Sequence, residues 1–277
     1  MRNNSVDYGL KFFNKVLGLN ELHWGYFTEK QIQEDNLTLS MLRKAQKEYT
    51  LHLLSYIPDG VQTILDVGCG LGEMAKLLLD RGYKVSLLSS DRYQEKVIKE
   101  KYPFLKFICS RFEDFVTSER YDMLLMAESV QYLLLEESIR NVNKLLNQNG
   151  YLLIADYFRK NNTKYYRTCK VLSEFKKALE NNSFYLCEAE DITDYVVPTI
   201  DFAMCCYNKY VLPSIEVLKN YTDTKISKLA MVVIRSIFRR QVNRLRYYIE
   251  VHTPHKLDSS VFKEKMNYVI QLWQKRL

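Results

Sequence analysis

Short apolar runs rich in β-branched residues alternate with longer amphipathic stretches between about residues 60 and 190. The first pattern predicts buried strands, and the second predicts helices. Strands are expected at Thr63–Val67, Lys84–Leu88, Leu105–Cys109, Tyr121–Met126, Tyr151–Ala155 and Phe184–Glu190, and helices at Leu71–Arg81, Tyr93–Lys101, Leu135–Leu146 and Val171–Leu179. This alternation is typical of a mostly parallel sheet with helices on both faces, the doubly wound α/β architecture.

The pattern changes to helices after about residue 194. Between residues 225 and 250 an apolar stripe and a basic stripe both recur at helical spacing. The apolar stripe consists of Ile234, Phe238, Val242, Leu245 and Ile249, and the basic stripe of Lys228, Arg235, Arg239 and Arg246. The last stretch, Asn267–Gln274, is expected to return to the sheet as a seventh, antiparallel strand.

These changes of pattern divide the chain into four parts. Residues 1–50 are expected to form helices that fold over the mouth of a site, and residues 51–193 form the α/β core. Residues 194–260 form a helical cap inserted before the last strand, which belongs to residues 261–277. A chain of 277 residues can bury one full core and still carry such a cap.

The composition, with 47% hydrophobic and 26% charged residues, is that of ordinary globular proteins. No apolar signal region opens the chain and no run of about 18 apolar residues occurs, so we expect neither export nor membrane spanning. The six cysteines lack the spacing of a metal site, which predicts reduced thiols, no metal and a cytoplasmic location. The net charge of +7 is modest.

The strongest chemical signal is the segment Asp66-Val67-Gly68-Cys69-Gly70-Leu71-Gly72, between a predicted strand and a predicted helix. Closely spaced glycines let the backbone turn sharply and approach a ligand without interference from a Cβ atom. A dinucleotide-binding fingerprint would need its third glycine at position 73, which is Glu73. A phosphate-binding P-loop would need a Gly-Lys-Ser/Thr sequence, which this segment lacks.

The segment resembles the first motif of the Rossmann-like, class I S-adenosylmethionine-dependent methyltransferases. The resemblance implies a Rossmann-like fold with S-adenosylmethionine as its cofactor. It also implies that the turn of Gly68, Cys69, Gly70 and Gly72 approaches the methionine part of the cofactor, while Asp66 helps to place its ammonium group. The likeness covers about residues 60–156 and carries no information on the substrate.

The end of the second predicted strand departs from the family pattern. Family members usually carry an acid there, which binds the ribose hydroxyls. Here Ser89, Ser90 and Asp91 stand at and after that position, and any one of them could bind the ribose. Members of the cyclopropane fatty-acid synthase-like branch also have a hydroxyl residue in place of the acid.

The third and fourth strand ends extend the resemblance. Arg111 replaces the first acid of the family's adenine-binding segment, so adenine contacts would pass to the backbone and Phe112, with Glu113 either beside the adenine or in a solvated turn. The fourth strand ends in Ala127 and Glu128, at the edge of the sheet where ligands bind in such folds.

Leu22–Phe27 resembles the segment that closes the site in tocopherol- and sterol-type methyltransferases. Methyl transfer is an in-line displacement, for which an enzyme supplies alignment and sometimes a base. The candidate bases are His23, Tyr26, Glu128 and Tyr132, each of which could instead be structural.

The leading functional prediction is methyl transfer to a small apolar or amphipathic acceptor, such as a lipid, a quinone or a polyketide-like compound. The basic helix over residues 225–250 could bind an anionic membrane surface or be a solvated face. Nucleic acid is not an expected partner, because Ala127-Glu128-Ser129-Val130 stands where an Asn-Pro-Pro-Tyr-type segment would lie. A nucleic-acid methyltransferase, a catalytically silent cofactor-binding relative and a cyclopropane-forming enzyme are the alternatives.

Overall fold

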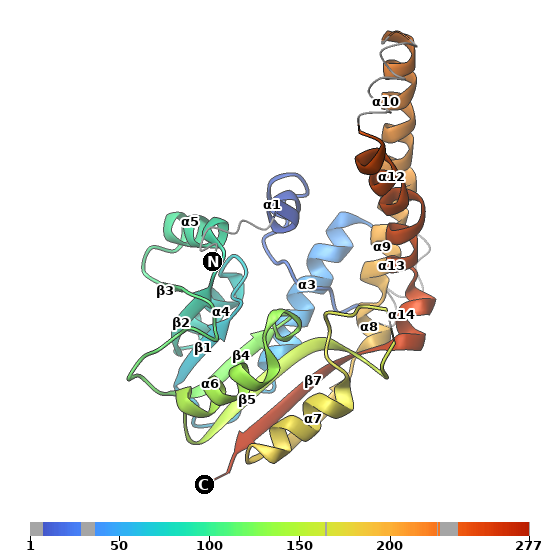
Figure 1. Ribbon diagram of the computed structural model, residues 1–277. Helices are drawn as coiled ribbons and strands as arrows, with labels where there is room; N and C mark the ends of the chain where they lie inside the picture. Colours follow the sequence, from blue (N-terminus) through green and yellow to red (C-terminus); the bar gives the residue numbers. More distant parts are fainter. Residues whose placement is uncertain (1–7, 29–36, 164, 226, 228–237, 277) are drawn as a thin grey trace.

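The computed structural model describes residues 8–28, 37–163, 165–225, 227 and 238–276. Within them one seven-stranded sheet has the strand order β3-β2-β1-β4-β5-β7-β6. The pairs among β1 to β5 are parallel, while β7 lies antiparallel between β5 and β6 (Figure 1). The predicted doubly wound, mostly parallel sheet and its antiparallel returning strand are therefore confirmed.

The strands begin and end within two residues of the predicted bounds, except for one. They are β1 (Thr63–Val67), β2 (Lys84–Ser89), β3 (Lys106–Cys109), β4 (Tyr121–Ala127), β5 (Leu146–Arg159), β6 (Phe184–Asp191) and β7 (Met266–Lys275). The exception is β5, because the predicted turn at Asn149-Gly150 is a bulge inside the strand. Its pairing with β4 moves from Tyr121–Leu146 directly to Met123–Tyr151, and an inserted bulge leaves a strand paired on both sides.

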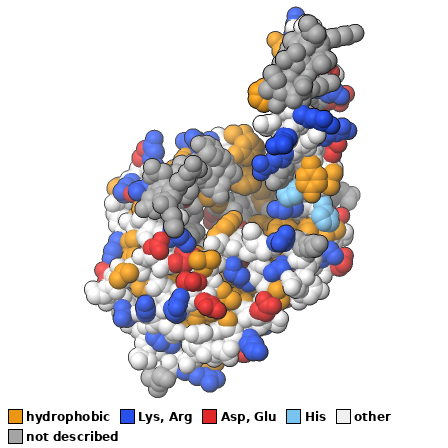
Figure 2. Space-filling model, viewed as in Figure 1, with side chains coloured by type: hydrophobic (Ala, Val, Ile, Leu, Met, Phe, Trp, Pro, Cys, Tyr) orange, Lys and Arg blue, Asp and Glu red, His pale blue; other side chains and the backbone are white. Residues whose placement is uncertain are grey.

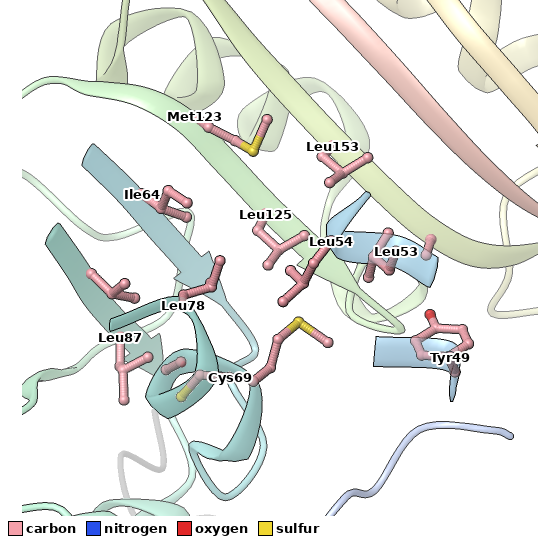
Figure 3. Packing of buried hydrophobic residues seen from close by; sticks show 14 of the residues in the cluster. Tyr49, Leu53, Leu54, Ile64, Cys69, Leu78, Leu87, Met123, Leu125 and Leu153 are labelled. Carbon is pink, nitrogen blue, oxygen red and sulfur yellow. The ribbon is translucent and has the colours of Figure 1, made fainter. Parts of the chain in front are cut away.

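Two apolar clusters cover the two faces of the sheet. Helices α3 (Leu39–Leu54), α4 (Glu73–Asp80) and α5 (Arg92–Lys101) pack on one face, and α6 (Leu135–Leu145) and α7 (Leu172–Asn181) on the other. Figure 3 shows Leu78 of α4 and Leu53 of α3 beside Ile64, Leu125 and Leu153 of the first face. Neighbouring Leu65, Leu124 and Leu152 belong to the opposite cluster, as the two-residue period of a strand requires.

The segment before the core is helical only in part. Between helices α1 (Tyr8–Lys15) and α3 in the sequence, residues 18–28 form a stretch that is neither helix nor strand. The expectation that residues 1–50 form helices is therefore met only in part. This stretch is fixed by Tyr26 N–H, which donates to the Ala45 carbonyl, and by Phe27 N–H, which donates to the Tyr195 carbonyl. Phe27 is fully buried, so the stretch is part of the packed structure. The predicted division at residue 50 falls inside α3.

The excursion between β6 and β7 is helical, as predicted. Its elements are α8 (Thr193–Val196), α9 (Pro198–Cys206), η2 (Tyr207–Val211), α10 (Leu212–Lys225), α12 (Arg239–Tyr247), η3 (Tyr248–His252), α13 (Thr253–Lys256) and α14 (Ser259–Lys265). Figure 1 shows α10 and α12 projecting beyond the sheet, and α10 has no buried residue among those described. We call residues 207–225 and 238–252 the projecting arm.

Part of the predicted amphipathic helix over residues 225–250 lies outside the described residues. This applies to Lys228, Ile234 and Arg235, and to the side chains of Val242 and Leu245. The described members of the basic stripe, Arg239 and Arg246, are exposed on α12. In the portion of the chain that the structure describes, no helix is both long and apolar enough to cross a bilayer.

Candidate active site

A cavity of about 830 Å³ opens at the carboxyl ends of β1, β2 and β4. Residues that end or follow these strands, including Val67, Ser89 and Ala127, line it together with Leu22 and Trp24 of the extended N-terminal stretch. Crevices beyond the carboxyl ends of parallel strands are the usual ligand sites of open α/β sheets. Figure 2 shows hydrophobic side chains gathered toward the middle of this side of the molecule, below the projecting arm.

The glycine turn after β1 requires left-handed backbone at three positions, with φ of +81° at Gly68, +55° at Gly70 and +85° at Gly72. A Cβ atom on Gly68 would lie 2.6 Å from the Cβ of Ser129, so this glycine is needed for close packing. A Cβ on Gly70 would meet nothing nearer than Leu22 at 4.0 Å. Gly70 therefore leaves its backbone open to the cavity, where a ligand can approach it.

Gly72 also has a structural role. It does not line the cavity, and its backbone faces the Ile98 and Tyr102 side chains of α5, at 3.4 and 3.3 Å from an added Cβ. Its left-handed conformation forms the N-cap of α4. The structure thus gives Gly72 a role in the entry into α4 and in its packing, and cofactor contact by this glycine stays a prediction.

Two buried polar atoms at the turn have no hydrogen-bond partner within the described residues: Asp66 Oδ2 and Ser129 Oγ. Asp66 is 3% exposed, and burial raises the pKa of its carboxyl to about 7. A buried carboxylate without a partner costs several kcal/mol, so such a group is typical of a ligand site rather than of a packed core. Both residues line the cavity, as do Gly68 and Cys69.

All three candidates for the ribose contact lie at the cavity beyond β2. Ser89 Oγ accepts a hydrogen bond from Asp91 N at 3.2 Å, and Asp91 Oδ1 accepts one from Gln94 N at 2.9 Å. Asp91 is thus the N-cap of α5 and presents its carboxylate near the helix N-terminus. Ser90 lines the same wall, and so does Gln94, whose Oε1 is buried without a hydrogen-bond partner in the described structure.

Arg111, Phe112 and Glu113 line the far end of the cavity. Glu113 is not solvated: its Oε1 accepts from Leu134 N at 3.0 Å, and its Oε2 lies 3.5 Å from Arg111 Nη2. It therefore joins the loop after β3 to the loop after β4. The Phe112 carbonyl accepts a hydrogen bond from the Asn141 amide, so this carbonyl is already used within the protein.

Glu128 stands where β4 ends and has left-handed backbone, with φ of +55°. Its Oε1 accepts from Trp24 N at 2.7 Å and from the Tyr268 hydroxyl at 2.8 Å, and Tyr49 Oη lies 2.8 Å behind Tyr268 Oη. Burial, assisted by the negative charge of Asp156, raises the pKa of Glu128 to about 8 against these two hydrogen bonds. A carboxyl with such a pKa can exchange a proton near neutral pH.

His23 lines the cavity, but both of its ring nitrogens are bonded inside the protein. Nδ1 lies 2.8 Å from the Trp24 carbonyl, and Nε2 lies 3.0 Å from Thr50 Oγ1. The carbonyl can only accept, so Nδ1 carries the proton, and burial lowers the pKa of the ring to about 4. The ring also stacks on Tyr49 at 4.3 Å. This arrangement favours the structural role that the sequence had left open.

The other two candidate bases differ in position. Tyr132 lines the cavity at its mouth, where it is 74% exposed. Tyr26 does not line the cavity: its ring stacks on Tyr195 at 4.7 Å and packs against His52 at 4.6 Å. These contacts hold the Tyr26 ring among His52 and Tyr195, and its assignment as a base stays a prediction.

Several lining residues are not among the predicted site residues. They are Gln94, Ser129, Gln131 and Tyr157, whereas Trp24 belongs to the predicted site-closing segment Leu22–Phe27. The Tyr157 hydroxyl donates to Gln131 Oε1 at 2.7 Å, and Trp24 stacks on Tyr157 at 5.3 Å. Ser129 and Tyr157 could have been found, since Ser129 follows the end of β4 and Tyr157 lies just beyond the last residue pair of β4 and β5, Ala127–Ala155, at the same edge. Gln94 depends on tertiary contacts that leave no local sequence signal.

The residues present fit S-adenosylmethionine. A buried acid with an unpartnered oxygen suits an ammonium group, an open glycine suits close approach of a ligand, and polar groups at the end of β2 suit ribose hydroxyls. Among the residues described, no cluster of three or more His, Cys, Asp or Glu side chains could hold a metal ion.

Comparisons of sequence agree with this geometry. The sequence model of a family described as a methyltransferase domain matches residues 65–154. The malonyl-acyl-carrier-protein O-methyltransferase of Anoxybacillus flavithermus is 28% identical over 134 residues, which are 47% of this chain and 52% of that protein. The chain spans about half the length of the curated relatives it matches.

Solved structures share the fold over nearly the whole chain. One is the geranyl diphosphate C-methyltransferase of Streptomyces coelicolor, in complex with Mg²⁺, geranyl-S-thiolodiphosphate and S-adenosyl-L-homocysteine. At 12% identity it covers 99% of this chain and 94% of its own, with a TM-score of 0.68. The O-methyltransferase from a trans-AT PKS multienzyme of Brevibacillus brevis, in complex with S-adenosyl-L-homocysteine, is 15% identical, with 93% and 85% coverage and a TM-score of 0.63.

Proposed function

We propose that this chain, which contains a class I S-adenosylmethionine-dependent methyltransferase domain, transfers a methyl group to a small apolar or amphipathic acceptor. The observation that carries the proposal is the pair of unpartnered buried polar atoms, Asp66 Oδ2 and Ser129 Oγ, beside the open backbone of Gly70. Such atoms need a polar ligand, and the family match identifies which ligand fits them.

The cofactor would be held by residues at three strand ends. Asp66 would accept from its ammonium group, and Gly68, Cys69 and Gly70 would face its methionine part. The ribose would lie against the Ser89–Asp91 wall, and the adenine against the Arg111–Glu113 wall with Ala127 opposite. When bound, S-adenosylmethionine supplies a methyl group on a positively charged sulfur.

The remaining wall suits an acceptor with an apolar body. Trp24 and Tyr157 present stacked aromatic surfaces, and Phe13 and Tyr132 stand at the mouth with 42% and 74% of their surface exposed. Large exposed aromatic residues at a cavity mouth are typical of sites that receive apolar ligands. Glu128 is the group best placed to take a proton from the acceptor, since it lines this wall and exchanges a proton near pH 8.

Calorimetric titration with S-adenosylmethionine and S-adenosylhomocysteine, with NAD as control, tests the cofactor. We expect micromolar binding of the first two and none of NAD. An acceptor screen that covers lipophilic phenols, amines and acids then tests transfer. Absence of binding would contradict the proposal, whereas cofactor binding without transfer to any acceptor class would favour a catalytically silent relative.

The projecting arm supports a second part of the proposal, attachment to an anionic membrane surface. Arg239, Arg240 and Arg244 are exposed on α12, and exposed aromatic side chains of the arm include Tyr221 on α10 and Phe238 next to Arg239. Figure 2 shows the blue basic side chains gathered on the arm. Basic side chains interleaved with aromatic residues attract anionic headgroups and bind at the interface.

Sedimentation with vesicles tests this attachment. We expect binding to vesicles of phosphatidylglycerol and phosphatidylcholine, little binding to phosphatidylcholine alone, and loss of binding at high salt. The double variant Arg239→Glu/Arg240→Glu should lose it, while Lys96→Glu on α5, far along the chain from the arm, should not. Equal binding by both variants, or by neutral vesicles, would exclude the arm as an anionic-lipid site.

A further inference from the structure

Acidic side chains greatly outnumber basic ones in the lining of the cavity. Six carboxyl residues line it, namely Glu21, Asp66, Glu73, Asp91, Glu113 and Glu128. Among the described lining residues Arg111 is the one Lys or Arg. A ligand that enters this cavity therefore meets a surface rich in negative or proton-bearing oxygen atoms.

The positive charge of Arg111 is already compensated by its neighbours. Its guanidinium lies 3.5 Å from Glu113 Oε2 and 3.9 Å from Asp114 Oδ2. Arg111 follows β3, at the edge of the sheet, whereas Glu128 follows β4, which β2 and β1 separate from β3. Nothing among the described lining residues is thus available to neutralise an anionic acceptor.

A second carboxyl group lies behind the wall that we assign to the acceptor, which is formed by Trp24, Tyr157 and Glu128. Behind Glu128 lies Asp156, which is fully buried and whose negative charge raises the pKa of Glu128, while the positive charge of Lys170, which does not line the cavity, acts on Asp156 itself. Tyr268, Tyr49 and Tyr157 face Glu128 from β7, α3 and β5, and each is a neutral phenol whose pKa is raised by burial and by this carboxyl. His23 beside them is neutral, because burial lowers its pKa to about 4.

We propose that the acceptor presents an uncharged or cationic reacting group, a hydroxyl or an amine, and that the cavity rejects carboxylate and phosphate acceptors. This inference rests on the proposed function. A buried anion beside Glu128 and Asp156 would lose its hydration without gaining a countercharge, and this loss is how sites discriminate against a wrong ligand. A cation would gain from Glu128 and from the faces of Trp24 and Tyr157.

The reaction balances with these groups. A protonated amine first gives a proton to the Glu128 carboxylate, which frees its lone pair, whereas a hydroxyl or a neutral amine already has one. The lone pair of the oxygen or nitrogen forms the new bond to the methyl carbon, and the carbon–sulfur bond breaks with its electron pair left on sulfur. The proton of the acceptor passes to the Glu128 carboxylate and from there to solvent. A carboxylate acceptor carries no proton that must leave, so it would not need Glu128 as a proton acceptor.

Binding of matched amphiphiles tests the inference without turnover. Decylamine, decanol and decanoate share one apolar chain and differ in the charge of the head. They are titrated into the protein saturated with S-adenosylhomocysteine, at pH 9, which is above the pKa of Glu128 at about 8. We expect decylamine and decanol to bind at least about 10-fold more tightly than decanoate, which corresponds to about 1.4 kcal/mol.

The variant Glu128→Gln should reduce this selection by strengthening decanoate and weakening decylamine. Glu119→Gln changes the net charge equally, on an exposed carboxylate outside the cavity, and should leave the selection unchanged. Equal or tighter binding of decanoate, an unchanged selection in Glu128→Gln, or binding of none of the three would overturn the inference. Failure of S-adenosylhomocysteine to bind in the first step would instead refute the proposed function.

Discussion

The hydroxyl of Tyr268 donates a hydrogen bond to Glu128 Oε1 over 2.8 Å, across 140 positions of sequence. Through this bond the returning strand β7 fixes a carboxyl at the end of β4. Trp24 N donates to the same oxygen, so the N-terminal stretch, the core and the last strand meet at one atom. The contact explains why the antiparallel strand matters to the site and not only to the sheet.

Tyr268→Phe should raise the pKa of Glu128 further, because the hydroxyl that stabilises the carboxylate is removed. We expect the pH at which transfer reaches half its maximum to move upward, with a loss of stability of about 1–3 kcal/mol. Rate–pH profiles and denaturant unfolding measure the two effects. Tyr221→Phe on the exposed arm is the matched control and should change neither. An unchanged profile in Tyr268→Phe would contradict the role of this bond.

Asp66→Asn should weaken S-adenosylhomocysteine binding by about 10- to 100-fold, the range of one lost charge-assisted hydrogen bond. The fold should persist, since Asn has the same shape and the wild-type carboxylate has an oxygen without a partner in the described structure. Calorimetry and circular dichroism separate the two outcomes. Wild-type affinity in a folded Asp66→Asn variant would show that the ammonium group of the cofactor does not bind at Asp66.

Stability should fall as pH rises from 5 to 9. Asp66 and Asp156 have pKa values raised to about 7, and Glu128 to about 8, so the folded state holds protons that the unfolded state releases above its ordinary carboxyl pKa. Their stabilisation is full below the ordinary carboxyl pKa of about 4 and is lost progressively as pH rises to the folded pKa values of about 7 to 8, at about 1.4 kcal/mol per unit of pKa shift. Thermal unfolding should show a shallower decline in Glu128→Gln, and the wild-type decline in Glu119→Gln.

The two glycines of the turn should respond differently to a methyl group. Gly68→Ala places Cβ 2.6 Å from Ser129 at a φ of +81°, so we expect a loss of stability of about 2 kcal/mol or more. Gly70→Ala meets open space, so its cost is the left-handed backbone alone, and its main effect should be on binding. Unfolding curves and calorimetry on both variants compare these losses. A reversed order would show that Gly70 packs rather than receives a ligand.

His23→Ala should lower stability more than it affects transfer. The substitution removes two hydrogen bonds and the stack on Tyr49, which together correspond to about 1–3 kcal/mol. Melting temperature and initial rates, measured at a temperature where the variant is folded, check this. Full stability with abolished transfer would restore His23 as the base.

The sheet and the strand ends that line the cavity could be predicted from the sequence because their signals are local. Apolar runs and their spacing indicate strands and helices, and the Asp66–Gly72 segment indicates a turn that only glycines can form. The order of the parallel strands then places their carboxyl ends, and with them Ser89, Arg111 and Ala127, at one edge.

The acceptor wall was decided by the tertiary structure. The identity of a candidate base depends on its hydrogen-bond partners and burial, which bring Glu128 together with Trp24 and Tyr268, occupy both nitrogens of His23 and pack Tyr26 against Tyr195. These contacts join residues that are more than a hundred positions apart or depend on which side of an extended stretch faces the core. Sequence periodicity reports local conformation, whereas proton affinity and charge balance arise from groups that meet only when the chain is folded.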